Sequence, residues 1–250
     1  GILTGFNDAF IISSEKKDEL IAADPKSAEL IRPILRGRDV KRYGFSFADQ
    51  WIIATFPSCK YDIAQYPAIK QYFLSFRIER LEQTGATHII DGVPVKSRKK
   101  TNNKWFETQD SISYWNEFFK QKIIWGNLAL SAQFAWAEEG YFINAPSSMI
   151  VPGNKYLLAV LNSKLADWYI RQLGVTRNGG YFEYKPMFVE QLPVPVLDEE
   201  AQIPYIRLVD KILEEKRALN DTQHLESEIN QRVYALYHLR EDEILYMESQ

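Results

Sequence analysis

The sequence predicts an α/β fold, a mixed α+β domain with short strands that is followed by a helical spacer or hairpin. Short runs of β-branched and aromatic residues, bounded by turn residues, alternate with stretches of helical apolar spacing up to residue 192. After the Pro-Val-Pro stretch at 193–195 the sequence becomes helical and acidic. We therefore expect one domain over residues 1–196 and a helical region over residues 197–250.

The first expected elements lie at the N-terminus. A strand is expected at 6–12, because Gly5 provides a turn in front of an apolar run. A helix capped by Ser14 follows up to Ala23, and a second short helix begins at Pro25 and ends at Gly37.

The middle of the chain contains further strands and one helix. Residues 51–56 are β-branched and aromatic and predict a buried strand, and residues 66–82 carry one apolar face of helical spacing. Residues 85–103 are basic and rich in turn residues, which predicts a long surface excursion. Three more short runs predict strands at 122–125, 134–136 and 141–143.

Three amphipathic helices are expected towards the C-terminus. The first is capped by Asn154, runs from Tyr156 to about Leu173 and ends at Gly174. The apolar positions of the other two are Ile206, Val209 and Leu213, and then Leu225, Ile229, Val233, Leu236 and Tyr237. These two helices are expected to pack together. Their apolar spacing extends over too few heptads to predict a free-standing coiled coil.

The composition is that of a soluble globular protein, with 250 residues of which 46% are hydrophobic and 25% charged. No apolar run reaches membrane-spanning length, and the start has no signal-peptide pattern. Cys59 is the single cysteine, which excludes an internal disulfide and a thiolate zinc site and fits a cytoplasmic protein. Because the sequence has no initiator methionine, we expect it to be part of a longer protein.

The charge is distributed unevenly around a formal net charge of −3. Residues 197–250 hold 13 acidic and 6 basic residues, which leaves 20 acidic and 24 basic residues in 1–196. The basic residues of 1–196 form two clusters, Arg32, Arg36, Arg38, Lys41 and Arg42 around Asp39, and Lys96, Arg98, Lys99, Lys100 and Lys104 without any acidic residue. Such clusters suit phosphate, although a basic run is also typical of a solvated loop.

Catalytic signatures are weak in this sequence. The histidines His88, His224 and His238 have no metal-ligand spacing, and Cys59 has no local partner that would make it a nucleophile. There is no phosphate-binding glycine loop.

Two patterns imitate the acid and acid-x-Lys order by which many nucleases hold a divalent ion. The first is Asp167 with Glu183 and Lys185, and the second is Asp24 with Asp39 and Lys41. Both are expected by chance in a chain this rich in charge, and Asp167 is predicted to lie in the middle of a helix.

Several segments together resemble the TaqI-like C-terminal specificity domain, which follows the methyltransferase region in type II restriction-modification enzymes. The segments that carry the resemblance are 1–12, 24–29, 35–43, 156–165, 191–195 and 233–237. The resemblance is weakest from about 85 to 148. It also departs from the family at His238 and Arg240, where the terminal helix usually ends on glycine.

The resemblance implies a target recognition domain that reads a short sequence of double-stranded DNA and is not itself an enzyme. Adenine N6 methylation from S-adenosylmethionine, and often cleavage with Mg²⁺, would be carried out by an N-terminal methyltransferase domain and a nuclease domain of the same polypeptide. The Asn-Pro-Pro-Tyr type motif and the cofactor loop that methylation needs do not occur in this chain, so no cofactor is expected on it.

Three basic segments are the candidate DNA contacts. Arg36, Arg38, Lys41 and Arg42 are assigned to phosphate contact or to the fold, because that stretch belongs to the family motif. Base readout is assigned to the loop 96–104, where Arg98 suits guanine and Asn102 and Asn103 suit adenine, beside the lysines Lys96, Lys99, Lys100 and Lys104. Arg177 and Asn178, next to Gly179-Gly180, form the third candidate, because glycines allow close approach to phosphate.

Each assignment has a plainer alternative. Arg36 and Arg38 could pair with nearby carboxylates, the loop 96–104 could be disordered, and Gly179-Gly180 could only shape a turn. The aromatic residues beside the basic loop, Trp105, Phe106, Tyr114 and Trp115, are expected in the core rather than stacked on bases. Two rival functions also stay open, a metal-dependent nuclease site at Asp167, Glu183 and Lys185, and a protein-interaction module that docks through the acidic helices at 203–237.

Overall fold

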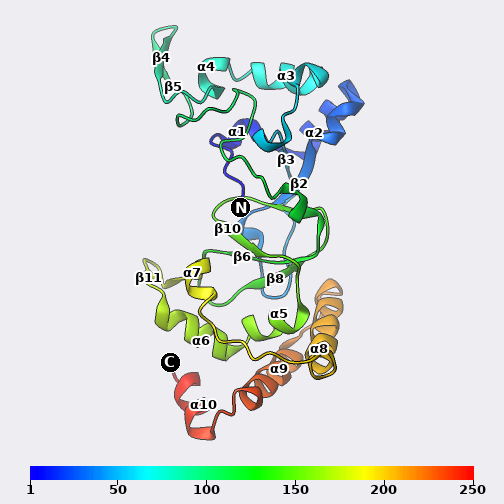
Figure 1. Cartoon of the computed structure of the whole chain (residues 1–250), viewed down its shortest axis with the longest axis vertical. Coiled ribbons are helices and arrows are strands. Elements are labelled where there is room, and N and C mark those ends of the chain that lie inside the picture. The colour runs from blue at the N-terminus through cyan, green and yellow to red at the C-terminus, as the bar shows by residue number, and fades with distance from the viewer. The chain divides into compact units, whose positions relative to one another are not determined.

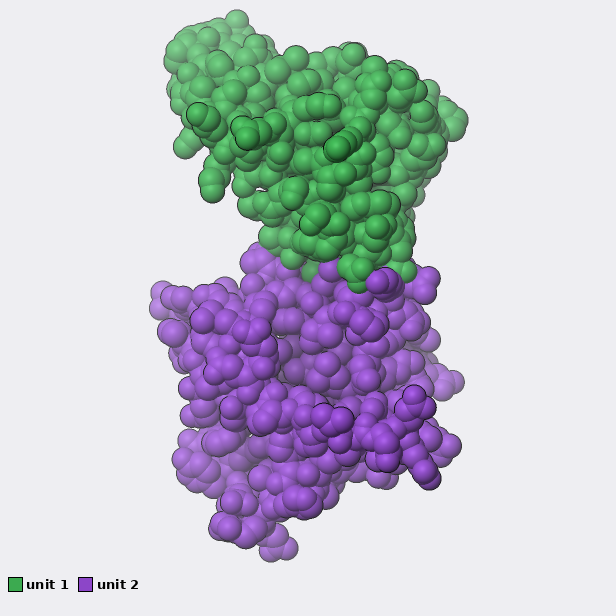
Figure 2. Space-filling view, viewed as in Figure 1, with its two compact units in different colours: residues 1–35, 47–119, 140–145 green, residues 36–46, 120–139, 146–250 purple.

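The computed structural model describes residues 1–250 and divides into two compact units (Figure 2). Unit 1 comprises residues 1–35, 47–119 and 140–145, and unit 2 comprises residues 36–46, 120–139 and 146–250. Each unit is thus built from three separate segments of the chain. The predicted division at 196 stays a prediction, and these two units follow a different division.

Unit 1 consists of a small sheet surrounded by short helices (Figure 1). Its helices are α1 (Asn7–Phe10), α2 (Ser14–Ala23), α3 (Pro67–Leu74) and α4 (Ile78–Leu81), and its short 3-10 helices are η1 (Pro25–Glu29), η3 (Pro57–Cys59), η4 (Ile63–Gln65) and η5 (Trp115–Phe119). Its strands are β1 (Ile11–Ser13), β2 (Ile31–Leu35), β3 (Gln50–Ile53), β4 (Thr87–Ile90), β5 (Val93–Lys96) and β9 (Phe142–Ile143).

The main sheet of unit 1 has the strand order β1-β3-β2-β9, with β9 parallel to β2 and the other pairs antiparallel. One face of this sheet carries the apolar core of the unit, which includes Phe10, Ile31, Ile53, Ile69 and Phe73. Burial of these side chains is what holds the short elements together, because none of them is long enough to be stable alone.

Unit 2 is a layered arrangement of a sheet and helices. Its strands are β6 (Lys122–Gly126), β7 (Leu128–Ala129), β8 (Phe134–Ala137), β10 (Ser147–Ile150), β11 (Thr176–Arg177) and β12 (Tyr181–Glu183). Its helices are α5 (Lys155–Leu161), α6 (Lys164–Leu173), α7 (Pro186–Val189), α8 (Glu199–Arg217), α9 (Gln223–Leu236), α10 (Glu241–Glu248) and the 3-10 helix η2 (Gly37–Asp39).

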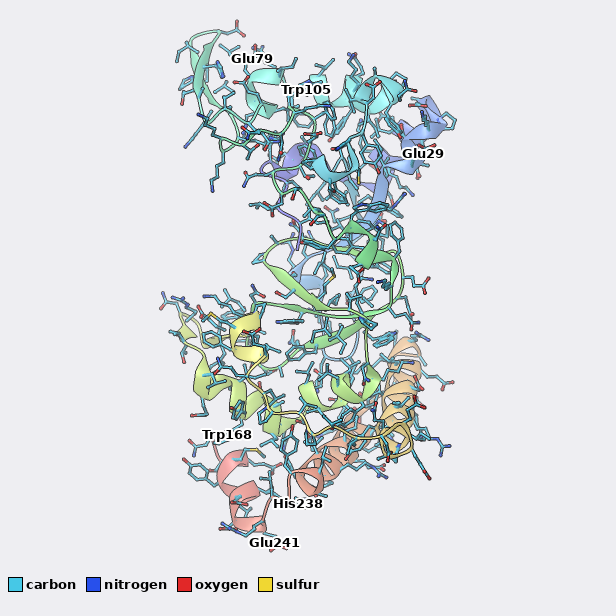
Figure 3. All side chains as sticks on the ribbon, in the orientation of Figure 1. Glu29, Glu79, Trp105, Trp168, His238 and Glu241 are labelled. Carbon is cyan, nitrogen blue, oxygen red and sulfur yellow. The ribbon has the colours of Figure 1, made fainter.

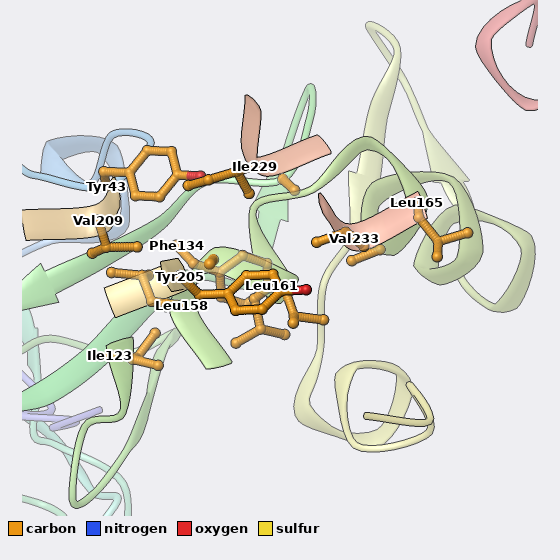
Figure 4. Close-up of a cluster of buried hydrophobic side chains, with 14 of the residues drawn as sticks. Tyr43, Ile123, Phe134, Leu158, Leu161, Leu165, Tyr205, Val209, Ile229 and Val233 are labelled. Carbon is orange, nitrogen blue, oxygen red and sulfur yellow. The ribbon is translucent and has the colours of Figure 1, made fainter. Parts of the chain in front are cut away.

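The antiparallel sheet β10-β6-β8 forms the first layer of unit 2, and a smaller sheet has the order β11-β12-β7. Helix α5 packs on β8 and on α8, and α9 packs on α5, α6 and α8 (Figure 1). The core between these layers joins Ile123 and Phe134 of the sheet to Leu158 of α5, Val209 of α8 and Ile229 of α9 (Figure 4). The acidic C-terminal helices are therefore part of the unit 2 core.

Several predicted elements are confirmed. The strands at 51–56, 122–125, 134–136 and 141–143 correspond to β3, β6, β8 and β9, and the two acidic helices correspond to α8 and α9. The helix predicted at 156–173 is present but is interrupted at Asn162 and Ser163, and Ser163 caps its second half α6 through a bond from the amide of Ala166.

Other predictions were wrong. The second N-terminal helix is only η1, because residues 31–35 pair with β3 and β9 as strand β2. The helix at 66–82 is broken into α3 and α4 at Arg77, whose φ is 67°. The excursion 85–103 contains the hairpin β4–β5, and helix α10 and strand β10 were not predicted.

None of the helices is both long and apolar enough to span a membrane.

Candidate nucleic-acid interface

The basic segment of unit 1 is organised around the buried side chain of Arg98, which is 2% exposed. Its Nε donates to the carbonyl oxygen of Leu81 at 2.7 Å, and its Nη1 donates to those of Thr4 and Glu107 at 2.8 Å. Its Nη2 donates to the carbonyl oxygen of Trp105 at 2.8 Å. One guanidinium thus joins the N-terminal segment, helix α4 and the loop that follows the hairpin.

These contacts contradict the prediction that Arg98 reads a guanine, because its side chain is buried and four of its five N–H donors are used by backbone carbonyls. The pKa of Arg98 is lowered to about 10, mainly by burial and in smaller part by the positive charge of the neighbouring Arg80, whereas Glu107 acts in the opposite direction. At neutral pH the group is still protonated and can donate all of these bonds. Arg98 is therefore a positioning residue for the segment around it.

Asn103 is likewise used by the fold. Its Nδ2 donates to the carbonyl oxygens of Thr108 at 3.2 Å and Gln109 at 2.8 Å, so the amide that was predicted to pair with adenine holds its own loop instead. Asn102, by contrast, is exposed. Of the two asparagines, only Asn102 presents its side chain to solvent.

Four exposed lysines of unit 1, the lysine cluster, surround this buried framework. They are Lys96, Lys99, Lys100 and Lys104. None of them forms an ion pair with a carboxylate among residues 1–250, whereas other surface cations such as Lys16, Arg77 and Lys164 do. The lysine cluster therefore keeps its charge available to an external anion.

A hollow of about 550 Å³ lies beside the lysine cluster. It is lined by Gly5, Arg80, Gln109 and residues 94–99. Gly5 has a φ of +79°, and a Cβ atom there would approach Gln109 Oε1 to 2.8 Å, so this position requires glycine. Arg80 and Gln109 were not singled out from the sequence, and no local pattern marks either of them.

The basic segment 36–42 lies in unit 2 and is largely satisfied by partners. The guanidinium of Arg36 donates to both carboxylate oxygens of Asp39 at 3.0 and 2.9 Å, and the backbone amide of Arg36 adds a third bond at 2.8 Å. Burial raises the pKa of Asp39, but the hydrogen bonds and charge of Arg36 outweigh it, and the pKa is lower than usual.

Arg42 is also paired, with a partner far away in the sequence. Its Nε donates to Glu226 on helix α9, and Glu226 also lies 3.2 Å from Nζ of Lys216 on α8. The next residue, Tyr43, exchanges backbone bonds with Phe134 and Trp136 of β8. Arg36 and Arg42 therefore serve the fold of unit 2, which was one of the two predicted roles, and Arg38 and Lys41 remain exposed.

The third candidate segment forms the turn between β11 and β12. Gly179 and Gly180 have φ values of 81° and 78°, as this turn requires. Arg177 pairs with the buried carboxylate of Glu183, and Asn178 is exposed.

The residues of the first nuclease pattern are used in structural contacts. Asp167 accepts hydrogen bonds from the amide of Ala132 at 2.8 Å and from the hydroxyl of Tyr184, and it pairs with Arg171 at 3.1 Å. Glu183 pairs with Arg177 and with Lys185, and these two cations lower its pKa. Nowhere among residues 1–250 do three or more His, Cys, Asp or Glu side chains form a group that could hold a metal ion.

Asp24 and Asp39 of the second nuclease pattern are also used in structural contacts. Asp24 caps η1 by accepting from the amide of Lys26 at 3.2 Å, and Asp39 binds Arg36 as described. The rival hypothesis of a docking module loses most of its apolar surface, because Val209, Ile229 and Val233 of the acidic helices are 0% exposed in the unit 2 core, although Ile203 and Leu219 of the same stretch are exposed.

The aromatic residues next to the basic segment belong mostly to the core. Phe106 is buried, and Trp105, which is labelled in Figure 3, packs on it edge-to-face with 5.5 Å between the ring centroids. Trp115 is half-buried, whereas Tyr114 is 39% exposed. The expectation of a core position is thus confirmed for Phe106 and Trp105.

Comparison with known proteins gives one family match. The family described as TaqI-like C-terminal specificity domain matches residues 32–194. No curated protein matches the chain.

Two solved structures are similar to the chain. The Type IIL restriction-modification enzyme MmeI, solved in complex with DNA, has a TM-score of 0.68 and 12% sequence identity over 100% of this chain and 35% of that chain. The type IIG restriction endonuclease BpuSI has a TM-score of 0.46 and 13% identity over 81% of this chain and 23% of that chain. The chain therefore spans well under half of either enzyme. The similarity to MmeI confirms the predicted mixed α/β fold.

Proposed function

Because the chain belongs to the family of TaqI-like C-terminal specificity domains, we propose that it recognises the DNA target of a restriction-modification enzyme. The family match over residues 32–194 is the observation that carries this proposal. The lysine cluster beside the hollow of unit 1 supports it, because an unpaired group of cations suits the phosphates of a duplex.

We further propose that the parent protein methylates adenine at N6 with S-adenosylmethionine and, if it also cleaves, uses Mg²⁺. These reactions would be carried out by a methyltransferase domain and a nuclease domain that precede this domain in the same polypeptide. The role of the present chain would be to hold a specific double-stranded sequence against them.

The lysine cluster is the proposed phosphate-binding surface. Asn102 of the same loop, Arg38 and Lys41 of unit 2, and Asn178 in the β11–β12 turn are exposed and stay proposed DNA contacts. Arg36, Arg42, Arg98, Asn103 and Arg177 are bound by partners within the protein and are proposed to act on the fold rather than on DNA.

The test is a fluorescence-anisotropy titration of the 250-residue chain with a mixed-sequence duplex at several salt concentrations. The double variant Lys99→Ala/Lys100→Ala removes two exposed charges without touching Arg98. We expect its affinity to fall at low salt and the slope of log K against log salt to become shallower by about 2, because each phosphate contact contributes about 0.9 to that slope.

A matched control is Arg207→Ala/Lys211→Ala on helix α8, which removes the same charge from two exposed positions of unit 2. This control should leave the salt slope unchanged. Equal effects of the two double variants would attribute binding to net charge alone and would refute the assignment to the lysine cluster. Absence of any duplex binding by the wild-type chain would contradict the proposed function itself.

A further inference from the structure

The hairpin β4–β5 projects from unit 1 beside the hollow and has a regular geometry (Figure 1). Its two strands pair antiparallel, with Thr87 opposite Lys96 and Ile89 opposite Pro94. The turn between them is Asp91-Gly92, and both residues have positive φ values, 51° and 80°. This two-residue turn with positive φ at both positions gives the strands the twist that a stable hairpin needs.

The two faces of the hairpin differ in burial. His88, Ile90 and Val95 on the inner face are half-buried, whereas Val93, next to the turn on the same face, is exposed. The carbonyl oxygen of Lys96 accepts a hydrogen bond from Arg80 Nη1 at 3.0 Å. The outer face is formed by Thr87, Ile89, Pro94 and Lys96, all of which are exposed. The inner face therefore attaches the hairpin to unit 1, and the outer face has no partner in the protein.

The outer face combines apolar surface with positive charge. Ile89 at its centre is 71% exposed, although burial of an isoleucine side chain stabilises a protein. Lys96 on the same face belongs to the lysine cluster, and the face carries no carboxylate. The nearest acidic residue of the hairpin, Asp91 in the turn, is paired with Arg77 at 3.1 Å. This arrangement is complementary to a polyanion that also offers apolar groups.

A DNA major groove is such a partner. It is wide enough to admit a two-stranded β-ribbon, its walls are phosphates, and its floor presents thymine methyl groups beside hydrogen-bond acceptors. We propose that the outer face of the β4–β5 hairpin enters the major groove and reads bases there, with Ile89 against a thymine methyl group and Thr87 on a polar base edge, while Lys96 binds a phosphate at the groove wall. This inference rests on the proposed function and assigns base readout to the hairpin in place of Arg98.

The first test places a photoreactive benzoylphenylalanine at position 89 of the full chain and irradiates it with a mixed-sequence duplex at low salt. The matched control carries the same side chain at position 245, because Leu245 on helix α10 is equally exposed, at 70% against 71% for Ile89. We expect a protein–DNA crosslink from position 89 and none from position 245. Binding of the duplex without a crosslink at 89, or equal crosslinking from both positions, would overturn the inference.

The second test selects bound sequences from a random duplex library with the wild-type chain and with Thr87→Ala/Ile89→Ala. The variant should lose about tenfold in affinity for the sequence that the wild type prefers, which is the effect of losing one good base contact, and its affinity for mixed-sequence DNA should change less than about twofold. An unchanged preference and affinity would refute the hairpin as the reader while leaving DNA binding intact. Failure of the wild-type chain to bind any duplex would instead refute the proposed function, and the inference with it.

Discussion

The two basic segments, 36–42 and 96–104, have a similar density of basic residues but differ in how those residues are paired. In segment 36–42, Arg36 pairs with Asp39 and Arg42 pairs with Glu226. The next residue, Tyr43, is hydrogen-bonded through its backbone to strand β8 of unit 2. In segment 96–104 the lysines are exposed without carboxylate partners, and Arg98 is the only basic residue that is buried. The difference shows that a cluster of positive charge can be neutralised by carboxylates within the fold or can stay exposed without a carboxylate partner.

The partner of Arg42 illustrates why this difference is hidden in the sequence. Glu226 lies 184 positions further along the chain, so no local window contains both members of the pair. Asp39, by contrast, stands three residues after Arg36 and was recognised as a possible partner. Local pairs can be anticipated, whereas distant ones depend on the tertiary fold.

The largest expected effect concerns the buried arginine of the exposed segment. Arg98→Ala should lower the free energy of unfolding by about 4 kcal/mol, because it leaves several buried backbone carbonyls without donors. Lys99→Ala, at the next position, is the control and should unfold like the wild type. Urea denaturation followed by circular dichroism measures both, and equal stability of the two variants would contradict the positioning role of Arg98.

A smaller effect is expected within segment 36–42, where two arginines can be compared directly. Arg36→Ala removes the partner of the buried Asp39 carboxylate and should cost about 2 kcal/mol, the effect of losing hydrogen bonds to a charged group. Arg38→Ala should change stability by less than about 0.5 kcal/mol, because Arg38 is exposed. If thermal denaturation ranked Arg38→Ala as the more harmful variant, exposure would not be the deciding property.

The ion pair of Arg42 and Glu226 is expected to make the stability of the protein depend on pH. Burial raises the pKa of Glu226, but Arg42, Thr222 and Lys216 outweigh it, so the folded-state pKa lies below the usual 4.5. A lowered carboxyl pKa stabilises the fold above the unfolded-state pKa, and this contribution is lost as the pH falls through the folded-state pKa.

Glu226→Gln is therefore expected to be less stable than the wild type at pH 7, by about 1 kcal/mol for a partly exposed pair. The difference should shrink once the pH falls below 4.5. Unfolding free energies at pH 7 and at several values below 4.5 give the comparison, and a gap that stays constant over this range would show that the charge of Glu226 is not involved.

The smallest effect on stability is expected for the lysine cluster. Lys99→Ala/Lys100→Ala should unfold within about 0.5 kcal/mol of the wild type, because exposed side chains without partners contribute little. The same variant is the one expected to weaken DNA binding most clearly. A marked loss of stability would show that these lysines have a structural role, and the contrast between the two segments would disappear.

Much of the fold follows from local signals in the sequence. The strands β6 and β8 were predicted because they are short β-branched and aromatic runs between turn residues, and the helices α8 and α9 because their apolar residues recur with a helical period. Strand β2 was mistaken for a helix, since its Ile31-Arg32-Pro33 sequence gives no clear period and its pairing with β3 and β9 is a tertiary feature. The hairpin β4–β5 carried a usable signal, the Asp91-Gly92 turn between apolar residues, which was overlooked.

The candidate site could be predicted only in part. The lysines of 96–104 were identified correctly as a cluster, and the structure leaves them exposed. The burial of Arg98 could not be foreseen, because it depends on four carbonyls from Thr4, Leu81, Trp105 and Glu107 that only the fold brings together. The sequence shows which side chains are positively charged, whereas the packing of distant segments decides which of them are exposed to solvent.

The way in which the two units share the chain limits how this protein can be re-engineered. Each unit takes three separate segments, so exchanging a whole unit between relatives requires several junctions, and a fragment that stops at residue 196 lacks the α8 and α9 side chains of the unit 2 core. The β4–β5 hairpin, in contrast, is one continuous stretch from Thr87 to Lys96 with an outer face that supports no core. Its outer-face residues can therefore be exchanged or randomised in a single step, while the inner face keeps the hairpin attached to unit 1.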